Sequence, residues 1–146
     1  MAPSAPAEIA QAVALTPACA VVLSSPSARA QALAAALARA HGATLEIDPR
    51  LAELDFGSWE GLAWAKIPRE ESDPWAEDPI NRAPPGGECF ADLKARVLAA
   101  MSGREATVVT HAGPIRALRM HVFGEAFETA FAHEVPYATP LAFPII

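Results

Sequence analysis

Two short apolar runs divide the chain, and each is followed by a turn and a helical pattern. Val21–Leu23 leads into the turn SSP, and Thr107–Thr110 leads into the turn HAGP. Short continuous apolar runs rich in β-branched residues, bounded by turn signals, are typical of buried parallel strands. The pattern therefore predicts two strand–turn–helix units of the same design.

Alanine-rich stretches on either side of the first run predict helices. Ala7–Leu15 reads as a short helix. After the strand, Ser25 suits an N-cap, Pro26 suits the first helical position, and Ala28–Ala40 is a strong helix former. Gly42 is placed to end this helix in a left-handed conformation.

The rest of the chain continues the alternation of strands and helices. Such alternation predicts an α/β fold, with a mostly parallel sheet between two layers of helices. The remaining predicted elements are an edge strand at Thr44–Ile47, a shaped loop at Glu53–Gly61, helical turns at Lys66–Glu71 and Asp73–Asp78, helices at Glu88–Met101 and Ile115–Phe123, and a last strand at Tyr137–Phe143.

Composition narrows the class of protein. With 146 residues, 52% of them hydrophobic and 19% charged, residues 1–146 form a single folded domain. A net charge of -6 and the lack of a basic stripe argue against nucleic acid as a partner. No apolar stretch reaches the ~18 residues of a membrane span, and the start lacks a signal-peptide pattern, so we expect a cytoplasmic protein.

Neither the cysteines nor the histidines show the spacing of metal ligands. Cys19 and Cys89 form no Cys-x-x-Cys pair, and we expect two reduced, partly buried thiols. The spacing of His111, His121 and His133 matches no zinc signature. We therefore predict no metal and no other cofactor.

An arginine and a histidine follow the two predicted strands. Arg29 lies in the first turn of the helix after SSP, and His111 stands where the second strand ends. Ligands bind at the carboxyl ends of strands in open α/β sheets, and helix N-termini attract anions. The pair predicts a phosphate-binding cup. A solvated helix arginine and a capping or core histidine remain the alternatives.

A glutamate in the shaped loop is the third candidate. Glu53 lies close in sequence to Phe56 and Trp59, which predicts a carboxyl group partly withdrawn from water, as a general acid requires. The alternative is an ordinary exposed loop glutamate. Glu60, in the same loop, is a weaker rival.

Four runs of residues carry a resemblance to a known family. SSPSARA at 24–30, LAELDFGSWEG at 51–61, PPGGE at 84–88 and VVTHAG at 108–113 resemble the histidine phosphatase (phosphoglycerate mutase-like) superfamily, in that family's order. The form FGSWEG looks most like α-ribazole phosphatase-like proteins of cobalamin biosynthesis. The resemblance covers nearly the whole chain.

The resemblance implies roles for the same three residues. Arg29 matches an arginine that binds phosphate, Glu53 matches the proton donor to the leaving oxygen, and His111 matches a histidine that binds the phosphoryl oxygens in the transition state. It also implies a phosphoglycerate mutase-like fold and a small phosphorylated molecule as ligand. In this family a phosphoryl group moves to a histidine and the phosphohistidine is then hydrolysed, without a metal.

The family's Arg-His-Gly motif, which carries the nucleophilic histidine, does not occur in this sequence. The one His-Gly pair, His41-Gly42, falls at the end of a predicted helix. By the resemblance, the first central strand, which lies beside Thr107–Thr110, and its catalytic loop are missing. Tyr137–Phe143 or a partner chain in a homodimer is then expected at that sheet position, because unpaired strand edges are costly.

Three interpretations follow and stay open. The first is a shortened relative that is inactive or very weakly active but still binds a phosphorylated ligand. The second is an active phosphatase whose Arg-His-Gly lies upstream of Met1. The third is a non-catalytic interaction module that accepts a strand beside Thr107–Thr110.

Overall fold

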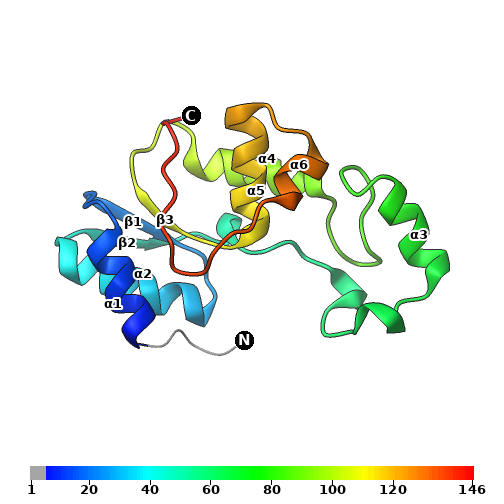
Figure 1. Cartoon of the computed structure of the whole chain (residues 1–146), viewed down its shortest axis with the longest axis horizontal. Coiled ribbons are helices and arrows are strands. Elements are labelled where there is room, and N and C mark those ends of the chain that lie inside the picture. The colour runs from blue at the N-terminus through cyan, green and yellow to red at the C-terminus, as the bar shows by residue number, and fades with distance from the viewer. Residues whose placement is uncertain (1–5) are drawn as a thin grey trace.

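A small parallel sheet organises the chain. The computed structural model describes residues 6–146. Strands β1 (Val21–Ser24), β2 (Thr44–Ile47) and β3 (Thr107–Val109) lie in the order β2-β1-β3, and both pairings are parallel (Figure 1). Val22 of β1 is in register with Leu45 and Thr107. The predicted α/β fold with a parallel sheet is confirmed.

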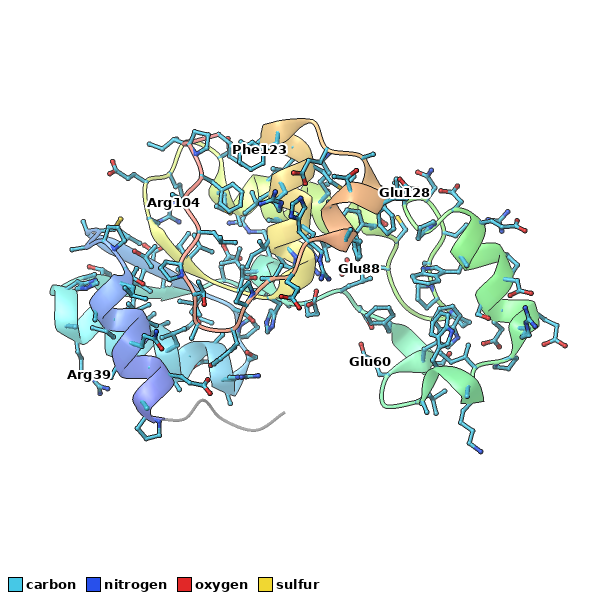
Figure 2. All side chains as sticks on the ribbon, in the orientation of Figure 1. Arg39, Glu60, Glu88, Arg104, Phe123 and Glu128 are labelled. Carbon is cyan, nitrogen blue, oxygen red and sulfur yellow. The ribbon has the colours of Figure 1, made fainter. Side chains whose placement is uncertain are left out.

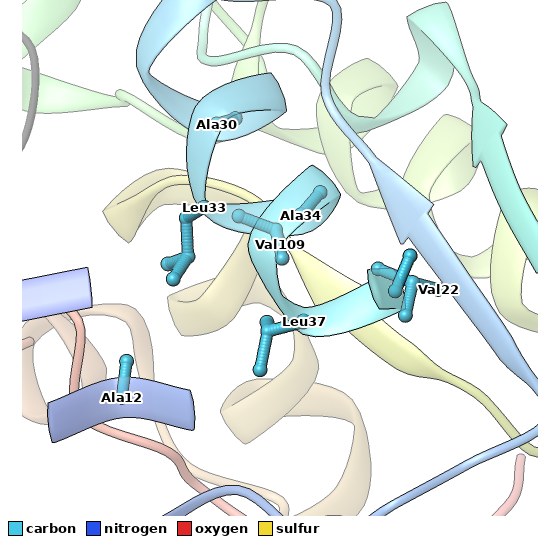
Figure 3. Close-up of a cluster of buried hydrophobic side chains, with 8 residues drawn as sticks. Ala12, Val22, Ala30, Leu33, Ala34, Leu37 and Val109 are labelled. Carbon is cyan, nitrogen blue, oxygen red and sulfur yellow. The ribbon is translucent and has the colours of Figure 1, made fainter. Parts of the chain in front are cut away.

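Two helices cover one face of this sheet. α1 (Pro6–Leu15) and α2 (Ala28–His41) pack against it through small and aliphatic side chains. Val22 of β1 and Val109 of β3 point into the same cluster (Figure 3). Gly42 ends α2 with φ 63°, as its sequence position predicts.

Three helices from the second half of the chain pack against one another in sequence order, and the first of them covers the opposite face of the sheet. These are α4 (Phe90–Met101), α5 (Ala112–Phe123) and α6 (Phe127–Ala132). Leu23 follows Val22 in β1 and therefore points the other way, where it packs with Leu51 and Ala100. Leu51 ends the short 3-10 helix η1 (Pro49–Leu51). Helices thus lie on both faces of the sheet.

A third region stands to one side of the sheet and is called here the aromatic lobe (residues 56–86). It holds the 3-10 helices η2 (Gly57–Trp59) and η3 (Trp64–Lys66) and the helix α3 (Arg69–Glu77) (Figure 1). The prediction of separate turns at 66–71 and 73–78 is wrong, because α3 runs through Pro74. One proline removes a single backbone donor there, and the helix continues beyond it.

The predicted last strand is absent. Residues 137–143 form no strand and pair with no strand of the sheet within residues 6–146. Pro136, Pro140 and Pro144 have no N–H to donate to a ladder, and Ala138 has φ 52°, which interrupts an extended run. The outer edge of β3 thus has no strand beside it in the described structure.

The helices are short. α2, the longest within residues 6–146, has 14 residues, whereas a membrane-spanning helix needs about 20. None of the described helices is both long enough and apolar enough to cross a membrane.

Candidate active site

The two strand-to-helix turns meet at one edge of the sheet. The amide of Ser25 donates to the carbonyl of Val109 over 2.9 Å, which joins the first turn to β3. The hydroxyl of Ser25 lies 2.8 Å from Nε2 of His111. Ser25 is only 1% exposed, so this hydrogen bond fixes the imidazole from within the protein. The two turns therefore form one structural unit.

The N-cap of α2 is Ser27, and the assignment of that role to Ser25 is wrong. Ser27 Oγ accepts from the amide of Ala30 over 3.2 Å. The amide of Ser27 in turn donates to Ser25 Oγ over 3.3 Å, which leaves the Ser25 hydroxyl proton free to point at Nε2 of His111. A serine does cap α2, as predicted, but it is the serine two residues further along the chain.

His111 stands at the N-terminus of α5 in a half-buried position. Burial lowers the pKa of His111 below 6.5, and the positive charge of Arg96 lowers it further, while the carboxylate of Glu53 works in the opposite direction. The imidazole is therefore mainly neutral at pH 7. Its side chain does not cap the helix, so the first amides of α5 are open to another acceptor.

Glu53 supplies that acceptor. Its Oε2 accepts from the amide of Gly113 over 3.3 Å, and its Oε1 accepts from the amide of Leu54 over 2.8 Å. A Cβ on residue 113 would collide with this carboxylate, so only glycine permits the approach. The geometry therefore places Glu53 beside the second turn.

The aromatic residues near Glu53 in sequence do not withdraw it from water. Glu53 is exposed, and Trp59 instead donates from Nε1 to Oε2 of Glu71 over 2.9 Å inside the aromatic lobe. Trp59 packs there edge-on against Trp64 and Trp75. The chain turns away between Leu54 and Phe56, so the expected desolvation of Glu53 by aromatic rings is wrong.

Arg96 of α4 fixes the backbone that carries Glu53. Its guanidinium donates to the carbonyls of Arg50, Ala52 and Glu53 over 2.7, 2.8 and 3.1 Å. It also pairs with the carboxylate of Glu88, whose Oε2 accepts from Nε over 3.1 Å. The LAELDFGSWEG and PPGGE runs therefore meet through one arginine.

A single cavity joins the three residues that the sequence predicted. Arg29, Glu53 and His111 all line a space of about 840 Å³ beside β3. The guanidinium of Arg29 stacks on the ring of Tyr137, with its central carbon 3.4 Å from the ring centroid. A cation, a carboxylate and an imidazole therefore line the same cavity, near the N-terminus of α5.

Other candidates lie elsewhere. Glu60 belongs to the aromatic lobe, where its Oε1 accepts from the amide of Phe56 over 3.0 Å (Figure 2). His41 is the last residue of α2, twelve residues beyond Arg29, or about 18 Å along the axis at about 1.5 Å per residue. Neither residue shares the cavity of the site.

The described residues show no metal-binding cluster. Within residues 6–146, no group of three or more His, Cys, Asp or Glu side chains is arranged to hold an ion. Cys19 and Cys89 are unpaired and partly buried.

Sequence reasoning missed three contributors to the site. Ser25 received a different role, and neither Arg96 nor Tyr137 was singled out. A buried serine at a strand end facing a histidine was the available signal for Ser25. Arg96 and Tyr137 act through contacts that span more than 40 residues of chain, which no local pattern records.

The family model of the histidine phosphatase superfamily (branch 1) matches residues 6–141. The chain therefore belongs to the histidine phosphatase superfamily, and its sheet and helices have the phosphoglycerate mutase-like fold of the structures below.

The curated relatives are much longer proteins. "Bifunctional protein Rv2228c" of Mycobacterium tuberculosis is 38% identical over 111 residues, which is 68% of this chain and 30% of that protein. "Uncharacterized protein Mb2253c" of Mycobacterium bovis gives the same values. The chain thus spans under a third of the length of these relatives.

Solved structures share the fold at similar levels of identity. A mycobacterial glucosyl-3-phosphoglycerate phosphatase, Rv2419c, solved with VO3, is 26% identical with a TM-score of 0.63, covering 88% of this chain and 68% of its own. TTHB049 from Thermus thermophilus is 27% identical with a TM-score of 0.61, covering 84% and 71%. "Mycobacterial hydrolase 1" is 27% identical with a TM-score of 0.65, covering 86% and 66%.

Proposed function

We propose that this chain binds the phosphoryl group of a phosphomonoester in the cavity beside β3. The observation that carries the proposal is the convergence of Arg29, Glu53 and His111 on that cavity. Family membership supports it, as do the solved structures of the mycobacterial phosphatase Rv2419c with VO3 and with inorganic phosphate.

Each residue has a distinct role in this proposal. The Arg29 guanidinium neutralises the phosphoryl oxygens, and His111 donates a hydrogen bond to them once an anion draws a proton onto its imidazole. Glu53 lies beside His111 at the second turn, and the resemblance gives it the role of proton donor to the leaving oxygen wherever the ester is hydrolysed. The Ala112 amide, the first of α5, adds a donor that neither the N-cap side chain nor Glu53 occupies.

Turnover is a separate matter from binding. The 146-residue sequence contains no Arg-His-Gly, and His41 lies at the far end of α2. A missing nucleophile costs several orders of magnitude in rate, so we propose binding with little or no hydrolysis by these residues alone. The alternative is an active phosphatase whose Arg-His-Gly lies upstream of Met1.

The form of the FGSWEG loop suggests the natural ligand. It resembles α-ribazole phosphatases, so we propose a cytoplasmic role in cobalamin biosynthesis with an α-ribazole phosphate as ligand. The glucosyl-3-phosphoglycerate phosphatase Rv2419c is named for a different phosphomonoester. Titration with a panel of phosphomonoesters tests this choice, because tightest binding of an α-ribazole phosphate is expected.

Isothermal titration calorimetry with inorganic phosphate tests the proposal. We expect saturable binding that Arg29→Ala and His111→Ala each weaken about ten-fold or more, the size of one lost charge-assisted hydrogen bond. Arg39→Ala is the matched control, because Arg39 is an exposed arginine of the same helix (Figure 2). No binding, or equal binding by all four proteins, would refute the site.

Hydrolysis of p-nitrophenyl phosphate tests the claim of little turnover. We expect the 146-residue chain to release almost no nitrophenol. Rapid release that His111→Ala abolishes would contradict that part of the proposal. The intact mass of the natively expressed protein then distinguishes the alternatives, since an upstream Arg-His-Gly requires a mass above 15.3 kDa.

The edge of β3 favours a second candidate function. β3 has no strand on its outer side within residues 6–146, and Thr107, Val108 and Val109 line the cavity. An open strand edge accepts an added strand, so we propose as an alternative a homodimer or a strand-capturing module. Light scattering showing a dimer whose cavity has no affinity for phosphate would favour this alternative.

A further inference from the structure

The stack between Arg29 and Tyr137 joins the candidate site to the C-terminal segment, which neither the sequence pattern nor the family match assigns to the site. Tyr137 is 39% exposed, so one face of its ring meets the guanidinium while part of the ring remains in solvent. A separation of 3.4 Å between the guanidinium carbon and the ring centroid is that of direct stacking.

The stack holds the Arg29 guanidinium by its face and uses none of the N–H donors of Nη1 and Nη2. Of the Arg29 nitrogens, only Nε is both buried and without a hydrogen-bond partner. No acceptor within residues 6–146 takes a hydrogen bond from Nη1 or Nη2, so both are available to a ligand in the cavity that Arg29 lines. A guanidinium that stacks by its face keeps its in-plane N–H groups for an oxyanion.

The backbone that delivers the ring is stiff and strained. Ala138, the next residue, has φ 52°, the only left-handed non-glycine residue in the described chain. Thr139 donates from Oγ1 to the carbonyl of Tyr137 over 3.2 Å, which closes the turn. Prolines at 136 and 140 flank it. Strain of this kind persists where surrounding contacts enforce it, and often marks a functional position.

We propose that Tyr137 is a positioning residue that aims the Nη1–Nη2 edge of Arg29 at the phosphoryl group. The inference rests on the proposed function and adds a residue to it. The ring replaces the carboxylate that holds other arginines of this chain, such as Arg96. A carboxylate partner would neutralise the guanidinium, whereas an aromatic partner fixes it and leaves its charge available to an anion.

Two variants distinguish the effect of the aromatic face of Tyr137 from the effect of its apolar bulk. Tyr137→Phe keeps the stack, and Tyr137→Leu keeps an apolar side chain but removes the aromatic face. We expect Tyr137→Leu to weaken binding of inorganic phosphate about five-fold, which is the size of one partly exposed cation–π contact, and Tyr137→Phe to bind as the unchanged protein does. In an Arg29→Lys background, Tyr137→Leu should have little further effect, because lysine lacks the planar group.

A measurement without ligand tests the stack itself. In the unchanged protein and Tyr137→Phe, the ring current should displace the Arg29 Nε–H resonance, and Tyr137→Leu should remove that displacement. Equal resonances in all three proteins would overturn the inference, whatever the outcome with phosphate.

The phosphate titration separates the two proposals. Tighter binding by Tyr137→Leu would show that the ring blocks Arg29 and would overturn positioning, as would unchanged binding, while the proposed function stands in both cases. No binding by the unchanged protein would refute the proposed function and, with it, this inference.

Discussion

The two strand-to-helix turns share one design but differ in how their helices begin. After β1, Ser27 caps α2 with its own side chain and satisfies the amide of Ala30. After β3, His111 leaves α5 uncapped by its side chain, and the amide of Gly113 turns to the carboxylate of Glu53. The turn after β1, called here the closed turn, is thus capped by its own residues. The turn after β3, called here the open turn, depends on a distant loop.

Because of this difference, the two turns contribute different chemical groups to the site. The closed turn offers a charge, the guanidinium of Arg29, from a helix whose start is already satisfied. The open turn offers groups that exchange protons or donate hydrogen bonds, namely His111 and the Ala112 amide. Ser25 joins the two through its hydroxyl. A shared backbone geometry therefore serves two different chemical purposes.

The largest expected effect comes from removing the support that only the open turn has. Arg96→Met leaves Glu88 and three backbone carbonyls without their donor, and should lower the free energy of unfolding by about 3 kcal/mol. Arg50→Met is the control, because the Arg50 side chain is about half exposed and, among the described residues, pairs only with the neighbouring Asp48, and it should lower the urea midpoint much less. Equal urea midpoints for the two variants would contradict this role of Arg96.

A smaller loss of stability should follow from removal of the side-chain cap in the closed turn. Ser27→Ala removes the side chain that caps α2, and should cost about 1 kcal/mol of unfolding free energy in urea titrations. Ser58→Ala, at an exposed serine outside the sheet, should cost less than half as much. A Ser27→Ala protein as stable as the unchanged one would mean that this turn is not closed by its cap.

The smallest expected effect is a pH dependence that belongs to the open turn. Because burial lowers the pKa of His111 below 6.5, the unfolded chain binds a proton near that pH more readily than the folded chain. The free energy of unfolding should therefore fall as pH drops from about 7.5 to about 5.5. His111→Gln should show a shallower fall, and an equally steep fall in both proteins would contradict the burial argument.

Local patterns predicted the strands and the ends of several helices. Val21–Leu23 and Thr107–Thr110 became β1 and β3 because short β-branched runs between helices have few alternatives in an α/β chain. Gly42 and Gly124 end α2 and α5 in left-handed conformations, as glycine permits. Arg29, Glu53 and His111 were predicted from their places at turns and from family motifs, and they share one cavity.

Contacts between distant segments were beyond those patterns. A last strand was predicted at 137–143, but Pro140, the flanking Pro136 and Pro144, and the left-handed Ala138 prevent one. Phe56 and Trp59 are close to Glu53 in sequence, yet the chain carries them into the aromatic lobe. The partners of Arg96 and Tyr137 depend on where whole elements pack, which sequence spacing alone does not specify.

The most direct test of the account follows backbone amides while inorganic phosphate is added to the isotope-labelled protein. The account predicts a saturable shift of the Ala112 amide, the first amide of the open turn's helix, which donates to no acceptor within residues 6–146. The Ala30 amide, which already donates to Ser27, should stay nearly unchanged. Equal shifts at Ala30 and Ala112, or none at either, would contradict the claim that the open turn receives the phosphoryl group.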